Sequence, residues 1–278
     1  MPSYSFEKKH TTTALTTITL ILSAYSTLRY LVFGKAINEN DPFDVGLTPF
    51  TGSIIIVFLY WMVMFLFQAL FIIRYFVSEE REHEDPRQSK AFLASNHFMA
   101  FNTITFFWTI LFGKGYYFFA ELLAIANFLN ITSLIIIHKT YITSQFSDYF
   151  LIHVSTAALP FSWLLYLIFW NGAAVFRSST GLIARILANI FIWNFLFVPV
   201  LFIVFFGDWA IGLSSSLLMF GLGIGQIATK VFALQWIFAF IISGILALFS
   251  LIAFVGYGTS FMVTIEREER APLLSEEA

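Results

Sequence analysis

The chain of 278 residues is 59% hydrophobic and only 12% charged, so it lacks the polar side chains that cover a soluble domain. Its formal net charge of −2 provides no overall basic surface, which argues against nucleic acid as a partner. Cysteine is absent, which excludes disulfides, thiolate catalysis, cysteine-based metal sites and palmitoylation. We therefore expect the lipid bilayer to be the solvent and the main partner of this protein.

Apolar runs divide the chain into segments long enough to cross a bilayer. A helix needs about 20 apolar residues to span a hydrocarbon core of about 30 Å. About eight segments meet this requirement: 12–33, 53–77, 91–112, 116–137, 147–170, 182–206, 209–229 and 231–257. The sequence predicts an all-α, polytopic transmembrane helix bundle, with a single transmembrane domain at 12–258 and tails at 1–11 and 259–278.

The first segment has two interpretations. Lys8 and Lys9 precede the apolar run TTTALTTITLILSAYS, an arrangement typical of a cleaved secretory signal. The run continues through Phe33, which is too long for the apolar core of a signal and favours an uncleaved span. A cleaved signal would leave about seven spans and an amino terminus in the lumen.

Lys and Arg are unequally shared between the two ends of the predicted bundle. With eight spans, the end that holds both termini carries nine of them and the opposite end carries six. Cytosolic connections carry the excess of positive charge, so both termini are expected in the cytosol. The segment SEEREHEDPRQSK at 78–90 lies on that side; its acidic cluster could bind a cation weakly, but a solvated loop is the simpler interpretation.

The carboxy-terminal tail has an acidic residue four positions before a leucine pair: Glu269, Leu273 and Leu274. In acidic dileucine sorting signals, the leucines enter an apolar slot on a coat adaptor while the carboxylate meets a basic patch. Pro272 and the neighbouring charges favour an extended, solvated segment. The pattern predicts a coat adaptor as partner and a vacuolar, endosomal or other post-Golgi membrane as location. A chance leucine pair in a disordered tail is the alternative.

Polar side chains inside the predicted spans are candidates for function, because an ionisable group in lipid is costly. Glu121 is the clearest, since it lies about two turns past Lys114 and cannot easily reach the headgroups. The predicted polar cavity or proton path is lined by Glu121, His97, His153, Arg185 and Asn189, the last two on one helical face. Alternatively, the amides tie helices together at about 1 kcal/mol each and Arg185 lies at headgroup level.

Other motifs point to packing rather than chemistry. Gly221 and Gly225 form a small-xxx-small pair, which predicts close approach of a neighbouring backbone. The five histidines include no pair three or four residues apart, so paired zinc ligands are lacking. Ser214 and Ser215 are faintly like a rhomboid nucleophile but no histidine follows, and Phe206-Gly207-Asp208 matches half of an intramembrane aspartyl site. We predict no enzyme activity, catalytic residue, metal or cofactor.

Four segments of the second half carry a family resemblance: AELLAIANFLNITSL, LPFSWLLYLIFWNGAA, ARILANIFIW and GIGQIATKVFALQWIFAF. They resemble a fungal family of multi-pass membrane proteins whose domain has unknown function. The resemblance covers roughly residues 90–255 and leaves the acidic tail outside. It implies an all-helical membrane fold and a fungal source, and it transfers no site residue to this chain.

Two functions from different classes fit these patterns. The leading hypothesis is movement of a small solute or lipid along a path near Glu121. The rival is a non-transporting scaffold that assists the assembly or trafficking of a membrane-protein partner, which would bind aromatic helix faces and the Gly221–Gly225 seam. Internal repeats typical of transporters are not visible in the sequence, which weakens the first hypothesis.

Overall fold

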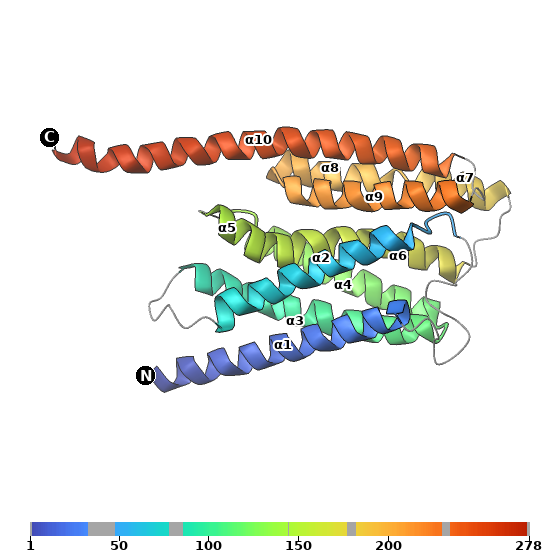
Figure 1. The fold of residues 1–278 in the computed structure, drawn as a ribbon, viewed down its shortest axis with the longest axis horizontal. Coiled ribbons are helices and arrows are strands. Elements are labelled where there is room, and N and C mark those ends of the chain that lie inside the picture. The colour runs from blue at the N-terminus through green and yellow to red at the C-terminus, as the bar shows by residue number, and fades with distance from the viewer. Residues whose placement is uncertain are drawn as a thin grey trace.

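A computed structural model describes residues 2–32, 48–77, 86–143, 145–176, 182–229 and 234–276. These ranges are helical apart from short turns, and they contain no strand. Figure 1 shows the helices running back and forth along one axis, so that the two termini lie at the same end of the bundle. The all-α fold expected from the sequence is confirmed.

The described residues form eight helical passes. Their elements in chain order are α1 (Pro2–Val32), α2 (Ile54–Ile72), η1 (Ile73–Val77), α3 (Pro86–Gly113), α4 (Tyr117–His138), α5 (Phe146–Asp148), η2 (Tyr149–Ala158), α6 (Leu159–Val175), α7 (Leu182–Phe191), α8 (Asn194–Phe206), α9 (Trp209–Thr229) and α10 (Gln235–Glu276). The segments η1 and η2 are π-helical. The α2–η1, α5–η2–α6 and α7–α8 segments each make one pass.

Six helices among these described ranges are long and apolar enough to cross a membrane: Ile54–Val77, Tyr117–His138, Phe146–Val175, Arg185–Phe206, Trp209–Ala228 and Gln235–Gly256. They support an integral membrane protein. The helices α1 and α3 lie in the same bundle but are not among these six in the described part of the chain; α1 is rich in threonine, and α3 contains Asn96, His97 and Asn102. The structure thus has the eight helical passes that the sequence predicts. Within the described residues, six of these passes are long and apolar enough to span a membrane.

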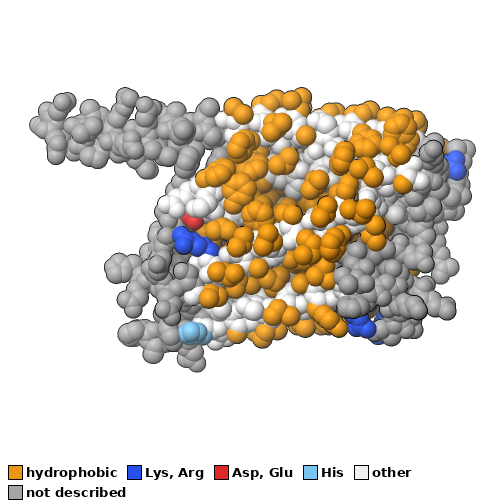
Figure 2. Space-filling view, in the orientation of Figure 1, with side chains coloured by type: hydrophobic (Ala, Val, Ile, Leu, Met, Phe, Trp, Pro, Cys, Tyr) orange, Lys and Arg blue, Asp and Glu red, His pale blue; other side chains and the backbone are white. Residues whose placement is uncertain are grey.

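The α5–η2–α6 pass is the centre of the bundle. In its most apolar window 89% of the residues are buried inside the protein, against 28% for Gln235–Gly256 at the edge. Trp163 of α6 meets Trp61 of α2 edge to face, with ring centres 4.9 Å apart. Figure 2 shows apolar side chains over the middle of the visible face, with the charged side chains towards the ends, as expected for a surface in contact with lipid.

A non-helical segment, 48–53, which begins with a turn closed by the Thr51 N–H and the Thr48 carbonyl, packs against α9 and α6. The Ser53 N–H donates to the Gly221 carbonyl at 2.8 Å, and Gln226 Nε2 donates to the Thr51 carbonyl at 2.8 Å. A Cβ added to Gly225 would lie 2.5 Å from the carbonyl carbon of Gly52, so this contact requires glycine. The backbone that approaches α9 at Gly225 therefore belongs to a non-helical segment and not to another helix.

The last helix differs from the sequence expectation. Instead of an extended tail, α10 continues to Glu276 and passes through Pro272. Figure 1 shows its carboxy-terminal end extending past the other helices. The expected extended backbone is therefore wrong over this range. Glu, Arg, Ala and Leu are strong helix formers, and extending a helix that already exists adds one hydrogen bond per residue.

Candidate functional site

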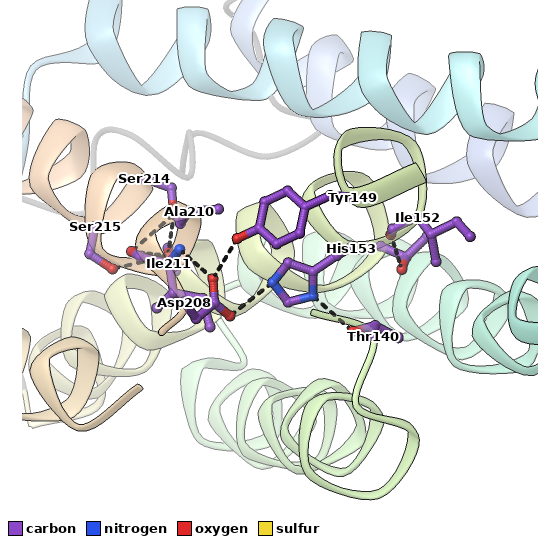
Figure 3. Close-up of polar contacts among 11 residues, drawn as sticks. Thr140, Tyr149, Ile152, His153, Asp208, Ala210, Ile211, Ser214 and Ser215 are labelled. Atoms are coloured by element: carbon purple, nitrogen blue, oxygen red, sulfur yellow. Dashed lines mark hydrogen bonds and ion pairs between the residues drawn. The ribbon is translucent and has the colours of Figure 1, made fainter. Parts of the chain in front are cut away.

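A buried histidine–aspartate pair lies at the end of the bundle that holds the termini. His153 Nε2 is 2.8 Å from Asp208 Oδ2, and both side chains are 0% exposed. The other ring nitrogen of His153, Nδ1, is 2.8 Å from Thr140 Oγ1. The Tyr149 hydroxyl donates to Asp208 Oδ1 at 3.2 Å. Figure 3 shows these side chains converging from three separate segments; we call Thr140, His153 and Asp208 the polar chain.

Asp208 is held in place by a turn between α8 and α9. Gly207 has φ +65°, and its N–H donates to the Ile203 carbonyl at 3.0 Å, which ends α8 in a left-handed residue. Asp208 Oδ1 then accepts the Ile211 N–H at 3.3 Å and caps the first turn of α9. The partial positive charge of this helix end stabilises the carboxylate. The Gly-Asp dipeptide therefore aims a carboxylate into the protein interior.

Local backbone conformations position the other members of the site. Helix α4 ends at Lys139, whose φ of 46° is left-handed although it carries a side chain, and Thr140 follows directly. Such a residue costs about 1–2 kcal/mol, so the surrounding contacts must hold this turn. His153 and Tyr149 are four residues apart in η2, and both reach Asp208. π-Helical turns are rare and are frequent at functional sites.

The contacts of His153 suit a ring that changes its protonation state. A threonine hydroxyl can donate to an unprotonated Nδ1 or accept from a protonated one, because the hydroxyl hydrogen rotates. Thr140 therefore satisfies the ring in either state without moving any heavy atom. The polar chain can thus hold or release a proton inside the bundle.

The same three residue types could also form a nucleophile, a base and an orienting acid. Thr140 is 1% exposed, however, and it does not line the cavity beside the chain. A substrate in that cavity would not reach its hydroxyl. The geometry therefore favours proton handling over nucleophilic chemistry.

A cavity of about 600 Å³, the termini-side cavity, opens beside the polar chain. It is lined by Tyr141, Ile142, Thr143, Tyr149, Ile203, Phe206, Gly207, Ala253 and Gly256. Tyr149 both lines this cavity and donates to Asp208. It therefore connects the polar chain to the open space.

The residues expected to line one polar path make separate pairs. Glu121 Oε2 accepts from Asn171 Nδ2 at 2.5 Å, which joins α4 to α6. His97 Nδ1 lies 2.8 Å from Asn130 Oδ1, which joins α3 to α4. Glu121 and Asn130 are nine residues apart on α4, about 13 Å along the axis. The structure does not bring Glu121, His97 and His153 to one lining.

The remaining predicted residues lie on α7. Arg185 is exposed, and Asn189 Oδ1 accepts from Gln235 Nε2 at 3.0 Å, joining α7 to the start of α10. Both lie at the end opposite the termini, where α7 is drawn in Figure 1. Only His153 of the predicted path therefore belongs to the polar chain. The acidic cluster at 79–85 lies outside the described residues.

Sequence reasoning missed Thr140, Tyr149 and Asp208. Asp208 was considered only as part of an incomplete aspartyl motif. Two signals could have identified it: Gly-Asp before an apolar run predicts a helix stop and an N-cap, and no other Asp or Glu occurs between Asp148 and Glu266. No sequence signal links Thr140 to His153, because their contact depends on how α4 ends.

Comparison with known proteins identifies relatives of the carboxy-terminal third. Residues 185–274 match a family described as "fungal protein of unknown function (DUF1774)". The chain is similar to a fungal family of unknown function. An uncharacterized protein of Schizosaccharomyces pombe is 45% identical over 76 residues, which are 27% of this chain and 28% of that protein. No solved structure matches.

The resemblance stated from the sequence is confirmed, with a different extent. The match begins at Arg185 rather than near residue 90, and it includes the leucine pair of the tail, which was expected to lie outside. It contains Asp208 and α9 but neither Thr140 nor His153. The family description provides no activity for this chain.

Proposed function

We propose that this chain is a multi-pass membrane transporter of a small solute, in which the polar chain takes up and releases a proton in each cycle. The observation that carries the proposal is the His153–Asp208 pair, fully buried in a bundle of membrane-length helices. Ionisable groups are costly in such surroundings and are typical of proton and substrate pathways. Tyr149 connects the pair to the termini-side cavity.

Proton uptake changes the charge of the bundle interior. With an unprotonated ring the pair carries the charge of Asp208, and one added proton leaves it neutral, whichever side chain holds that proton. A change of buried charge can favour one of two helix arrangements over the other. This is the physical link between protonation and movement of a solute.

Four charged side chains that the structure describes at this end are engaged elsewhere or exposed. Asp148 Oδ1 accepts from the Tyr75 hydroxyl at 2.7 Å, and Lys90 Nζ donates to the Ile142 carbonyl at 2.6 Å. Lys139 and Arg74 are exposed.

Purified protein in liposomes with a trapped pH-sensitive dye tests the proposal. A small-molecule extract of yeast cells, added outside, should produce an internal pH change that exceeds the change in protein-free liposomes. Asp208→Asn should abolish the change, since asparagine still caps α9 but cannot carry the charge. Glu121→Gln, on the separate α4–α6 pair, is the matched control and should behave as wild type. A wild-type signal equal to that of protein-free liposomes contradicts the proposal.

The absence of proton flux into liposomes would also bear on the alternative function, a non-transporting scaffold or assembly factor. If wild type moves no protons and purifies from mild detergent with a partner at fixed stoichiometry, the chain is a scaffold or an assembly factor. Its exposed aromatic side chains, such as Phe118 and Phe205, would then be available to that partner.

For location, we propose a vacuolar, endosomal or other post-Golgi membrane, with both termini in the cytosol. The support is the spacing of Glu269, Leu273 and Leu274, in the part of α10 that extends past the bundle. An amino-terminal fluorescent tag should mark such a membrane in wild type, and Leu273→Ala/Leu274→Ala should move it elsewhere. Arg270→Ala, which leaves the leucine pair and Glu269 intact, is the control. If wild type and the double mutant have the same distribution in the cell, the tail does not act as a sorting signal.

A further inference from the structure

Two cavities lie towards opposite ends of the bundle. The termini-side cavity contacts the end of the seam between the η2–α6 pass and α9 through Tyr149 of η2 and Gly207, which lies just before α9. Its other lining residues belong to α8, to α10 and to the turn after α4. A second cavity of about 300 Å³, the far-side cavity, is lined by Thr51, Gly52, Ser53, Ile54, Val57, Trp163, Tyr166, Trp170, Ile224, Gly225 and Ala228. Gly207 and Ile224 are about 25 Å apart along a helix, which is most of the hydrocarbon thickness. Together the cavities reach most of the way across the bundle.

A cluster of serines separates the cavities. Ser162 Oγ of α6 is 2.6 Å from Ser214 Oγ of α9, and Ser215 Oγ donates to Ser162 Oγ at 2.9 Å. All three are buried. Ser162 lies between Tyr149 and the far-side residues of α6 in the sequence. Ser214 and Ser215 lie between Gly207 and the far-side residues of α9. Figure 3 shows Ser214 and Ser215 on α9 beyond Asp208. We call these residues the serine cluster.

None of the described residues that line the two cavities is Asp, Glu, Lys, Arg or His. A charged solute would lose its hydration there without gaining a counter-charge. The linings offer instead aromatic rings, such as Trp163 and Trp170 on one side and Phe206 on the other, together with hydroxyl groups. This surface fits an uncharged molecule with both apolar and hydrogen-bonding parts.

We infer that the seam between α6 and α9 is the translocation route, and that it takes a small, uncharged solute with hydroxyl or amide groups. The two cavities are its two mouths, and the serine cluster is the barrier that opens between them. This inference rests on the proposed transport function and specifies its path and its substrate class.

The serine cluster is suited to opening. Ser214 Oγ also donates to the Ala210 carbonyl of its own helix at 2.8 Å, so this hydroxyl stays satisfied when α6 moves away. Serine side chains are small, and a solute hydroxyl can replace a serine partner with little loss of hydrogen bonding. Parting the helices separates the hydroxyls of Ser162 and Ser215, and a solute hydroxyl in the opened seam would take the place of the lost partner.

The absence of cysteine allows a direct test, because every introduced thiol is the only one in the protein. Ser215→Cys and Ser162→Cys place a thiol in the barrier. Ser216→Cys is the matched control: it is similarly buried on α9, but Ser216 Oγ donates to the Ser243 carbonyl of α10, away from α6. Methyl methanethiosulfonate, which is small and uncharged, is the probe, and intact-protein mass spectrometry measures the modified fraction in liposomes.

We expect Ser215→Cys and Ser162→Cys to react and Ser216→Cys to remain largely unmodified. A cationic trimethylammonium reagent should modify the barrier thiols at least about tenfold more slowly than the neutral one, because the seam offers it no counter-charge. Thr143→Cys, in the termini-side cavity, should react with the neutral reagent. Each variant is first checked for a single symmetric peak on size exclusion.

Two results would overturn the inference. If both barrier thiols react no faster than Ser216→Cys while Thr143→Cys reacts, the serines are static packing and the seam is closed. If the cationic reagent enters as fast as the neutral one, the substrate class is wrong. If the barrier thiols react but the liposomes show no proton flux, the route between α6 and α9 is retained and proton-coupled transport is rejected. The two proposals can therefore fail separately.

Discussion

The side chain of Asp208 makes two contacts that substitutions can separate. Its Oδ1 caps the helix through Ile211 N–H, and its Oδ2 faces His153 Nε2. Asp208→Ala should lose about 0.5–2 kcal/mol from the cap. It should lose about 1–3 kcal/mol more because a buried His153 nitrogen is left without a partner. Asp208→Asn keeps a good cap, and the ring can turn either a donor or an acceptor towards the amide.

Thermal unfolding in mild detergent should therefore rank the variants as wild type, then Asp208→Asn within a few degrees, then Asp208→Ala clearly lower. This order is independent of any transport assay. Equal melting temperatures for the alanine and asparagine variants would show that the cap and the contact with His153 contribute little to stability.

Glu121 is an ionisable residue in an apolar span, which is energetically costly, yet it lies outside the polar chain. Its carboxylate accepts from Asn171 Nδ2, while Asn171 Oδ1 is buried and has no hydrogen-bond partner. Glu121→Gln retains an acceptor and adds a donor that can reach this oxygen, so we expect wild-type or slightly higher thermal stability. Glu121→Leu should lower stability by about 1–3 kcal/mol, because Asn171 Nδ2 then keeps only its bond to the Tyr117 carbonyl. A glutamine variant as unstable as the leucine variant would contradict this interpretation.

At the scale of elements, the docking of segment 48–53 on α9 leaves no room for a methyl group at Gly225. A Cβ on Gly225 would meet backbone atoms of Gly52 and Ser53, which cannot rotate away. Gly225→Ala should therefore cost about 1–3 kcal/mol or prevent folding. Gly244→Ala on α10, where a Cβ meets nothing within 4 Å, should be neutral or stabilising by up to about 1 kcal/mol. Yield and monodispersity on size exclusion would distinguish the two, and similar behaviour would argue against the docked segment.

The elements also show what a single sequence can predict. Apolar length predicted the helical passes well, because backbone groups in lipid must be satisfied within the helix. Apolarity could not predict that η1 and η2 are π-helical or that α10 continues past residue 258, since these depend on neighbouring helices and on propagation. The His153–Asp208 contact joins residues 55 apart, which only tertiary packing determines. Glu121 was recognised as costly, but its partner Asn171 was not.

For the whole molecule, an even number of passes places both termini at one end, as Figure 1 shows. That end carries the polar chain and the termini-side cavity. The excess of Lys and Arg predicts that it faces the cytosol. In this orientation, the polar chain would exchange its proton with the cytosol, and the far-side cavity would face the lumen or the outside.

A split fluorescent protein can test this arrangement. The small fragment fused to either terminus should complement a large fragment expressed in the cytosol, because both ends lie on that side. The same small fragment inserted after Lys114, in the exposed turn between α3 and α4 at the opposite end, should give no signal. If α1 does not cross the membrane, the amino-terminal fusion alone gives no fluorescence. If the whole bundle is reversed, only the Lys114 insertion gives fluorescence. The proton exchange assigned to the cytosol would then take place on the other side of the membrane.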